Sequence, residues 1–118
     1  MKAESSKKWV IRFRVKDGRN FDEIASGTKA IETRAATAKY KKVRVGDTLV
    51  IVCGKHRLDK KVKKVEHFKS IDAMIKKIPF RKVMPSVASV TEMKKVYASY
   101  SGYKEKLDKL GIVAWALK

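Results

Sequence analysis

Three charged side chains stand close together in the stretch GTKAIETR, residues 27–34. Lys29, Glu32 and Arg34 fall within six residues of one another. An arginine offers a planar fork to a phosphate or a base edge, and a lysine adds a point charge. A carboxylate can accept a hydrogen bond from the amino group of cytosine. The same residues would also suit an ion pair on an edge strand, worth about 0–1 kcal/mol, so spacing alone leaves both interpretations open.

Positive charge dominates the composition. The 118 residues include 30 Lys and Arg against 12 Asp and Glu, which gives a formal net charge of +18. A domain of this size repels itself unless a polyanion neutralises it, and nucleic acid is the commonest such partner. The alternative is a lysine-rich protein whose charge serves only solvation. We expect nucleic-acid contact that weakens as salt rises.

The length predicts one domain with a short flexible arm before it. We expect the arm at residues 1–8 and a single domain over residues 9–118. No apolar run approaches the roughly 20 residues that a membrane span needs, and the first residues lack the apolar core of a signal peptide. The single cysteine fits a reducing compartment. These features predict a cytoplasmic protein without membrane contact.

The first third of the chain predicts two strands around a short helix. Alternating apolar residues indicate a half-buried strand at 9–16. Residues 20–27 suit a helix that Asn20 caps and Gly27 ends. In the strand expected at 28–34, Glu32 and Arg34 share a face, and Lys29 must reach them from the start of the strand. Residues 35–42 are expected to form a loop.

The rest of the chain predicts three more strands and two helices. An unbroken apolar run at 49–53 suits a strand covered on both faces, and a slip in the alternation of 58–68 predicts a bulge. Helices are expected at 70–78 and 89–100, where Ser70 and the capping box of Ser89 and Glu92 mark the starts. Two loops are expected, at 79–88 and 101–110. A last strand at 111–118 is expected inside the sheet, beside the first strand.

This order of elements predicts an α+β fold. Short strands that follow one another closely suit a small β-barrel of about five to six strands, flanked by two to three helices.

The segments FDEIASGTKAIETR and VRVGDTLVI together resemble the ASCH domain family of the PUA-like superfamily. The family pattern is a short helix ending in Gly, then Lys, an acidic or hydroxyl residue and Arg, followed by a Gly-Asp turn. The matching positions here are Gly27, Lys29, Glu32, Arg34, Gly46 and Asp47. The resemblance covers roughly residues 9–117. It implies a PUA-like barrel with a cleft lined by the Lys and the Arg, and RNA as partner.

The resemblance also implies a possible enzyme. Some bacterial relatives are small amidohydrolases that act on N4-acetylcytidine, and ribonuclease activity has been ascribed to other members. The amidohydrolases use the Lys, a Thr three residues later and a distal Glu. Lys29 matches, but Glu32 stands at the Thr position, and the Glu position falls near Ser86, with no acid between Ile78 and Thr91. We therefore expect RNA binding; the alternative is a hydrolase of RNA or a modified nucleoside, with Lys29 and Glu32 as its catalytic pair.

A basic loop and a basic strand are further candidates for RNA contact. Their cations would follow a phosphate backbone, and a tyrosine among them would stack on a base. The alternative is that these lysines keep an edge strand from pairing with another chain. The candidates are Tyr40, Lys41, Lys42, Arg44, Lys60, Lys61, Lys63 and Lys64.

The sequence predicts neither a metal site nor a cofactor. Cys53 and His56 have a C-x-x-H spacing, but a structural zinc site needs four ligands and His67 is the only further soft ligand. The chain has no glycine-rich phosphate loop. Cys53 is expected in the core.

Overall fold

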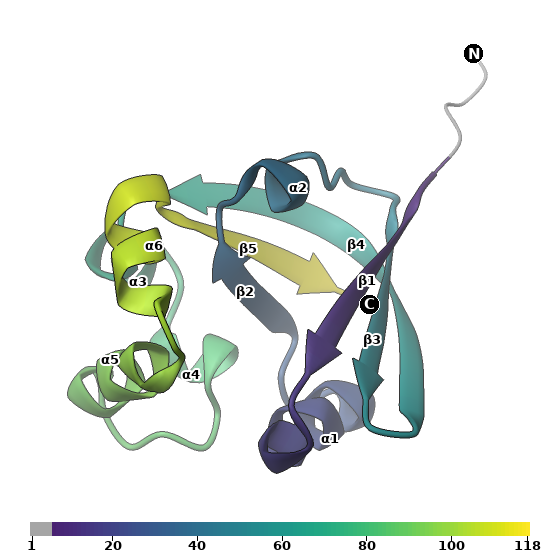
Figure 1. The fold of residues 1–118 in the computed structure, drawn as a ribbon, viewed down its shortest axis with the longest axis horizontal. Helices are drawn as coiled ribbons and strands as arrows, with labels where there is room; N and C mark the ends of the chain where they lie inside the picture. Colours follow the sequence, from purple (N-terminus) through teal and green to yellow (C-terminus); the bar gives the residue numbers. More distant parts are fainter. Residues whose placement is uncertain (1–5) are drawn as a thin grey trace.

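Residues 6–118 are described by a computed structural model, and they form one five-stranded sheet (Figure 1). Along the sheet the strands follow the order β1-β3-β4-β5-β2. β1 pairs with β3 in parallel, and the other neighbours are antiparallel. β1 and β2 are therefore the two edges. The strands are β1 (Lys8–Phe13), β2 (Ile31–Ala35), β3 (Thr48–Cys53), β4 (His56–Phe68) and β5 (Ile112–Leu117).

Helices gather in two places around this sheet. Four of them, α3 to α6, lie together on one side of the molecule, and α1 lies at the end of the sheet near the turn between β3 and β4 (Figure 1). A 3-10 turn, η1 (Val15–Asp17), joins β1 to α1. The helices are α1 (Gly18–Ser26), α2 (Ala38–Lys41), α3 (Ile71–Lys77), α4 (Phe80–Val83), α5 (Val90–Ser99) and α6 (Tyr103–Leu110).

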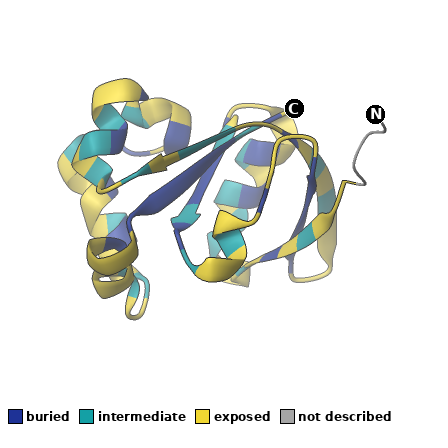
Figure 2. Cartoon of the chain, turned by 90° about the horizontal axis from the view of Figure 1, so that it is seen from above, coloured by how far each residue is buried: buried dark blue, intermediate teal, exposed yellow. Residues whose placement is uncertain are grey.

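The curled sheet separates two apolar cores. One core lies inside the curl and centres on Ile11, Leu49 and the fully buried Trp115. The other lies between the sheet and helices α3 to α6, and includes Met74 and Met93. Figure 2 shows buried residues along the central strands and exposed residues on the outer sides of the helices. β5 serves both cores, which explains why its sequence is apolar without interruption.

The α+β fold expected from the sequence is confirmed, with five strands in the described part of the chain. The expected place of the last strand is wrong. β5 lies inside the sheet, but between β4 and β2 rather than beside β1. Apolar periodicity identifies a buried strand without naming its neighbours, and the parallel pairing of β1 with β3 takes the place expected for β5.

Three segments expected to be loops contain helices: α2 within 35–42, α4 within 79–88, and α6 within 101–110. The helices therefore exceed the two or three expected. α2 and α4 are single turns of four residues, too short for an apolar period to appear. α6 has Tyr103, Leu107 and Leu110 at the i, i+4, i+7 spacing of an amphipathic helix, so its sequence does carry a helix signal; Leu107 is buried and Leu110 is 43% exposed.

Most local signals hold. The bulge expected in 58–68 occurs between Val62 and Lys64, and Gly27 ends α1 with a φ of 86°. The Ser70 and Ser89 side chains cap α3 and α5. Asn20 does not cap α1, because the 3-10 turn lets the helix begin earlier, at Gly18.

A buried carboxylate fixes the start of β1. Asp47, 6% exposed, accepts hydrogen bonds from the backbone N–H groups of Lys7 and Arg44 and from the indole of Trp9, at 2.9–3.0 Å. Burial would raise the pKa of Asp47, but these donors hold the pKa below its ordinary value. The Gly-Asp turn is therefore a structural clamp between β1 and β3.

The predicted flexible arm, residues 1–8, lies partly outside the described residues, which start at residue 6. β1 begins at Lys8, one residue before the strand expected from the sequence. Among residues 6–118, no helix combines the length and hydropathy that crossing a membrane requires.

Candidate functional site

The two edge strands, β1 and β2, are bridged by side chains. Arg34 of β2 donates from Nη2 to the carbonyl oxygen of Arg12 at 3.2 Å. Lys39 of α2 donates from Nζ to the carbonyl oxygen of Val10 at 3.3 Å. Carbonyls two residues apart point the same way along a strand, so both cations reach the same edge of β1. The gap in the curled sheet is thus lined with positive charge.

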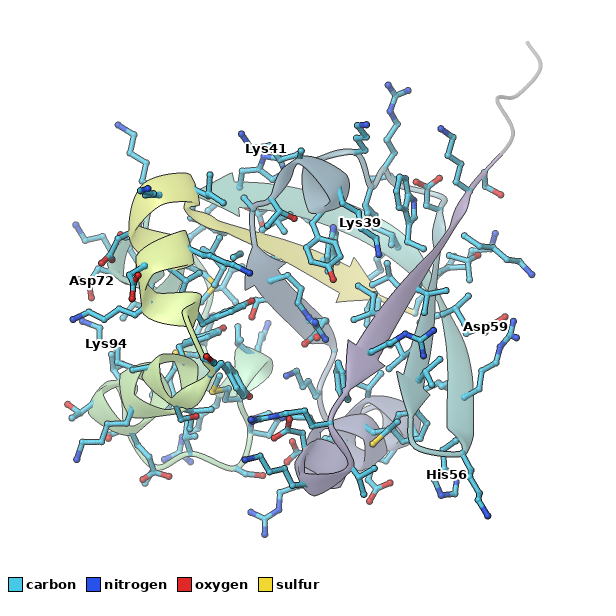
Figure 3. All side chains as sticks on the ribbon, in the orientation of Figure 1. Lys39, Lys41, His56, Asp59, Asp72 and Lys94 are labelled. Atoms are coloured by element: carbon cyan, nitrogen blue, oxygen red, sulfur yellow. The ribbon has the colours of Figure 1, made fainter. Side chains whose placement is uncertain are left out.

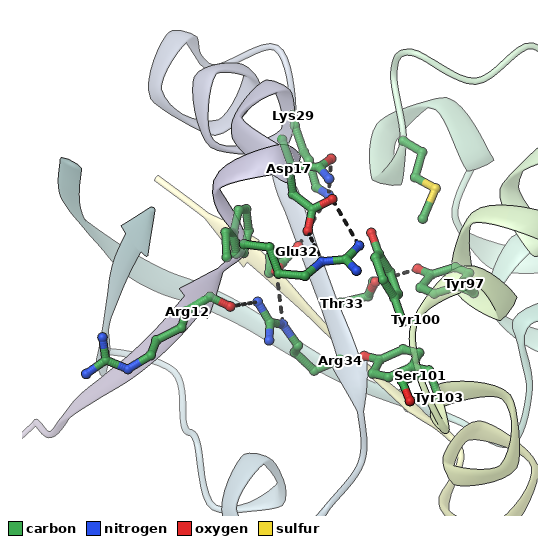
Figure 4. Close-up of a pocket in the computed structure, with 14 residues that line it drawn as sticks. Arg12, Asp17, Lys29, Glu32, Thr33, Arg34, Tyr97, Tyr100, Ser101 and Tyr103 are labelled. Atoms are coloured by element: carbon green, nitrogen blue, oxygen red, sulfur yellow. Dashed lines mark hydrogen bonds and ion pairs between the residues drawn. The ribbon is translucent and has the colours of Figure 1, made fainter. Parts of the chain in front are cut away.

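A cavity of about 310 Å³ lies at this gap (Figure 4). Its walls come from the end of β1, η1 and the start of α1, from β2, and from the segment that joins α5 to α6. Four cationic side chains and two carboxylates line it. The lining residues are Arg12, Phe13, Arg14, Asp17, Asn20, Lys29, Glu32, Thr33, Arg34, Met84, Tyr97, Tyr100, Ser101 and Tyr103.

The Glu32 carboxylate pairs with two of the cations that line this cavity. Its Oε1 lies 3.3 Å from Lys29 Nζ, and its Oε2 lies 3.2 Å from Arg34 Nε. The side chains of Glu32 and Lys29 are 5% and 4% exposed, and that of Arg34 is 20% exposed. One carboxylate therefore carries two cations, and the cluster keeps a net positive charge in a site largely shielded from water.

The local fold explains how a lysine comes to be buried here. Gly27 turns the chain back with a positive φ, and the backbone N–H of Lys29 donates to the backbone carbonyl oxygen of Glu23 at 2.9 Å. The Lys29 side chain then enters the cavity from before the start of β2. There Nζ also donates to Asn20 Oδ1 at 3.4 Å. An ammonium has three donors, and these two contacts leave one for a ligand.

Arg34 is held by aromatic rings as well as by Glu32. Its guanidinium carbon lies 5.2 Å from the ring centre of Phe13 and 6.0 Å from that of Tyr40. Burial alone would lower the pKa of Arg34, but the Glu32 carboxylate, together with Tyr40 and Tyr103, raises the pKa above its ordinary value. Arg34 is therefore a permanent cation with a fixed orientation.

Three tyrosines form the wall opposite β1. Tyr97 and Tyr103 stack with their rings 4° from parallel, and Tyr100 meets Tyr103 edge to face at 5.5 Å. Burial raises the pKa of Tyr97 far above its ordinary value and that of Tyr103 to about 12. The hydroxyl of Tyr97 hydrogen-bonds Thr33, and that of Tyr103 accepts from the backbone N–H of Ala35 at 2.7 Å. This wall is rigid and uncharged at neutral pH.

A cation and an aromatic ring meet across the cavity. The guanidinium carbon of Arg14, at the end of β1, lies 4.9 Å from the ring centre of Tyr100, at the end of α5. Asp17 orients Arg14 through two hydrogen bonds, from Nε at 2.7 Å and from Nη2 at 3.2 Å. The side chain of Arg14 remains 45% exposed. Arg14 can therefore move, whereas the tyrosine wall is fixed.

The other basic residues predicted to contact RNA lie outside the cavity. Tyr40 does not line the cavity, but its ring lies near the guanidinium of Arg34, which does. In Figure 3, Lys39 lies on the side of α2 toward β1, and Lys41 points away. The lysines at 60, 61, 63 and 64 belong to β4, which β3 separates from β1 and β5 separates from β2. Lys42 follows α2, and Arg44 lies in the turn before β3.

Arg14, Asp17, Thr33 and the three tyrosines are not among the site residues predicted from the sequence. The signal for the tyrosines was present: Tyr97, Tyr100 and Tyr103 recur every three residues. Gly102, with a φ of 69°, turns the chain between α5 and α6 so that all three reach one wall. The loop expected at 101–110 concealed this. Thr33 also lines the cavity, and its hydroxyl hydrogen-bonds Tyr97 of the opposite wall.

The positions that matter for a hydrolase are occupied as follows. Glu32 stands where the amidohydrolase pattern has Thr, and it contacts Lys29. The Ser86 hydroxyl, near the position of the distal acid, donates to the Glu23 carboxylate of α1. Neither Ser86 nor Glu23 is among the residues that line the cavity. In residues 6–118 no group of three or more His, Cys, Asp or Glu side chains is placed to hold a metal ion.

Residues 18–117 match the ASCH domain family, and the chain belongs to this family. It is also similar to two solved structures. A crystal structure of hypothetical protein PH0355 is 30% identical, with a TM-score of 0.82 over 94% of this chain and 97% of that one. A solution NMR structure of protein PF0455 from Pyrococcus furiosus is 27% identical, with a TM-score of 0.73 over 94% and 96% of the two chains. No curated protein matches the sequence.

Proposed function

We propose that this ASCH domain, a PUA-like barrel, binds RNA and holds one nucleotide in the cavity between β1 and β2. The observation that carries the proposal is the cluster of two cations around the buried Glu32. Such a cluster offers fixed donors and one fixed acceptor, as recognition of a base edge or a phosphate requires. The volume of about 310 Å³ is at the lower end of the range for ligand pockets. It suits one nucleotide rather than a longer segment.

The chemistry of the cluster favours holding a ligand over cutting it. Lys29 lies between a carboxylate and an amide oxygen, where an ammonium has donors but no free electron pair. Both oxygens of Glu32 already contact cations. The remaining donors, on Lys29 and on Nη1 of Arg34, are available to a ligand. The net charge of +18 would add attraction to the RNA backbone.

Fluorescence anisotropy with a labelled single-stranded RNA tests the proposal. We expect binding that weakens steeply as salt rises, and a clear loss of affinity in Lys29→Gln. Arg57→Gln is the matched control, because it removes one positive charge from an exposed ion pair on β4. Equal affinities for the two variants, or no binding by the wild type at low salt, would refute the proposal.

Hydrolysis of RNA or a modified nucleoside is the second candidate. The contact of Lys29 with Glu32 in a water-poor cavity favours it, because such pairs serve in acid–base catalysis. Prolonged incubation of the protein with N4-acetylcytidine, and separately with single-stranded RNA, tests it. Turnover that disappears in Lys29→Gln would establish an enzyme, and intact substrates would remove this candidate.

A further inference from the structure

Arg14 and Tyr100 both line the cavity, and they contact each other. The two residues come from opposite walls, 86 positions apart in the sequence. Arg14 has one face toward the Tyr100 ring, at 4.9 Å, and its edge bound by Asp17. We propose that these two side chains form a clamp that takes one unpaired base between the guanidinium and the ring. This inference rests on the proposed RNA binding.

Tyr100 is the fixed half of the clamp. It follows the last turn of α5, where its N–H donates to the Tyr97 carbonyl at 3.2 Å and its own carbonyl accepts from Tyr103 at 3.0 Å. Tyr103 supports the ring edge to face, and is itself held by Ala35. A ring supported in this way is a stacking platform, and a base of any kind can stack on it.

Arg14 is the mobile half. Stacked bases are spaced about 3.4 Å apart, so a base between two planes requires about twice that separation. The present distance of 4.9 Å means that Arg14 must move by about 2 Å. Its side chain is 45% exposed, so solvent gives it room. Arginine planes stack on bases in RNA complexes, and the cation then covers the second face of the base.

This geometry selects for unpaired nucleotides. A base inside a duplex has both faces covered by its neighbours, and extruding it costs a few kcal/mol. A base in a single strand or loop can enter without that cost. Lys29, Glu32 and Arg34 lie deeper in the same cavity and would meet the edge of the clamped base.

Fluorescence of 2-aminopurine tests the clamp, because stacking of this base changes its emission. It would be placed at each position in turn of a short single-stranded RNA, and affinity would be measured in parallel with the unmodified RNA. We expect one position to respond. Tyr100→Ala should remove that response and weaken binding roughly 5- to 150-fold. Tyr100→Phe should retain both, and duplex RNA should bind more weakly.

Arg14→Gln is compared with Arg57→Gln, since each removes the arginine of an Arg–Asp pair and one positive charge. We expect the larger loss, with a smaller fluorescence response, in Arg14→Gln. Tyr100→Leu keeps an apolar side chain at the rim and separates loss of stacking from loss of folding, which thermal melts would report. RNA binding that is equally strong in Tyr100→Leu, Arg14→Gln and Arg57→Gln would overturn the clamp alone. Failure of the wild type to bind any RNA would overturn the proposed function and the clamp with it.

Discussion

Lys29 and Glu32 lie 3.3 Å apart, and neither side chain is more than 5% exposed. Fully charged pairs are seldom this deeply buried, because taking two ions from water costs more than their attraction usually returns. Arg34 adds a second cation to the same carboxylate. A buried cluster of charges that adds little to the stability of the fold is typical of a functional site, where the charges serve to bind a ligand.

Replacing Glu32 should destabilise the fold, because two cations would lose their shared counter-ion. Breaking a buried pair on one side costs about 3–5 kcal/mol. We expect Glu32→Ala to approach that loss and Glu32→Gln to lose less, since the amide oxygen still accepts a hydrogen bond. Denaturant unfolding measures both. Wild-type stability in Glu32→Ala would mean that the cluster is hydrated and loosely held.

Asp47→Asn should destabilise the protein by about 2–3 kcal/mol at neutral pH, because hydrogen bonds to a charged acceptor are weakened or broken. The pKa of Asp47 in the folded state lies below its ordinary value of 3.8. Its contribution is therefore complete above about pH 4 and is lost as the pH falls through the lowered folded-state pKa. Unfolding measured between pH 7 and pH 2 should show the two proteins converging at low pH. If the difference in stability between the two proteins stayed constant over this pH range, protonation of Asp47 would not contribute to the loss of stability in acid.

The raised pKa of Tyr103 predicts that the free energy of unfolding falls at alkaline pH. Its pKa is raised from 10.0 to about 12 in the folded state, so above pH 10 the unfolded chain gives up a proton that the folded chain retains. Stability should fall between pH 10 and pH 12. In Tyr103→Phe this dependence should shrink, while the unpaired N–H of Ala35 costs about 1–3 kcal/mol at neutral pH. An unchanged alkaline profile would show that burial of this phenol contributes nothing.

The β4 lysines offer a test of how far RNA extends beyond the cavity. Changing the four lysines at 60, 61, 63 and 64 to glutamine should weaken RNA binding at low salt. The slope of log affinity against log salt should fall by about 0.7 for each phosphate that the variant no longer neutralises. Affinity for a single nucleotide should not change, because these residues lie outside the cavity. If RNA affinity also stays constant, the lysines serve only to solvate the strand.

Local chemistry made much of the fold predictable. Gly27, Ser70 and Ser89 each act where their backbone or capping role was expected, and the slip in alternation located the bulge after Val62. The placement of β5 was not predictable, because strand neighbours depend on the path of the whole chain.

The site was predictable where its residues are close in sequence. Lys29, Glu32 and Arg34 lie within six residues, so one segment brings them together. Arg14 and Tyr100 meet only because β1 and α5 end at the same cavity. No local sequence pattern predicts that contact. The regular spacing of the three tyrosines could have indicated a shared wall, but residues 101–110 were expected to form a loop rather than helix α6.

Mapping of RNA binding by NMR tests the central claim most directly. Backbone amide shifts would be followed while a short single-stranded RNA is added to the labelled protein. We predict that the largest changes fall on three segments that meet at the cavity: residues 12–17, 29–34 and 97–103. Changes confined to β4 and α2, or the absence of any change at low salt, would contradict the account.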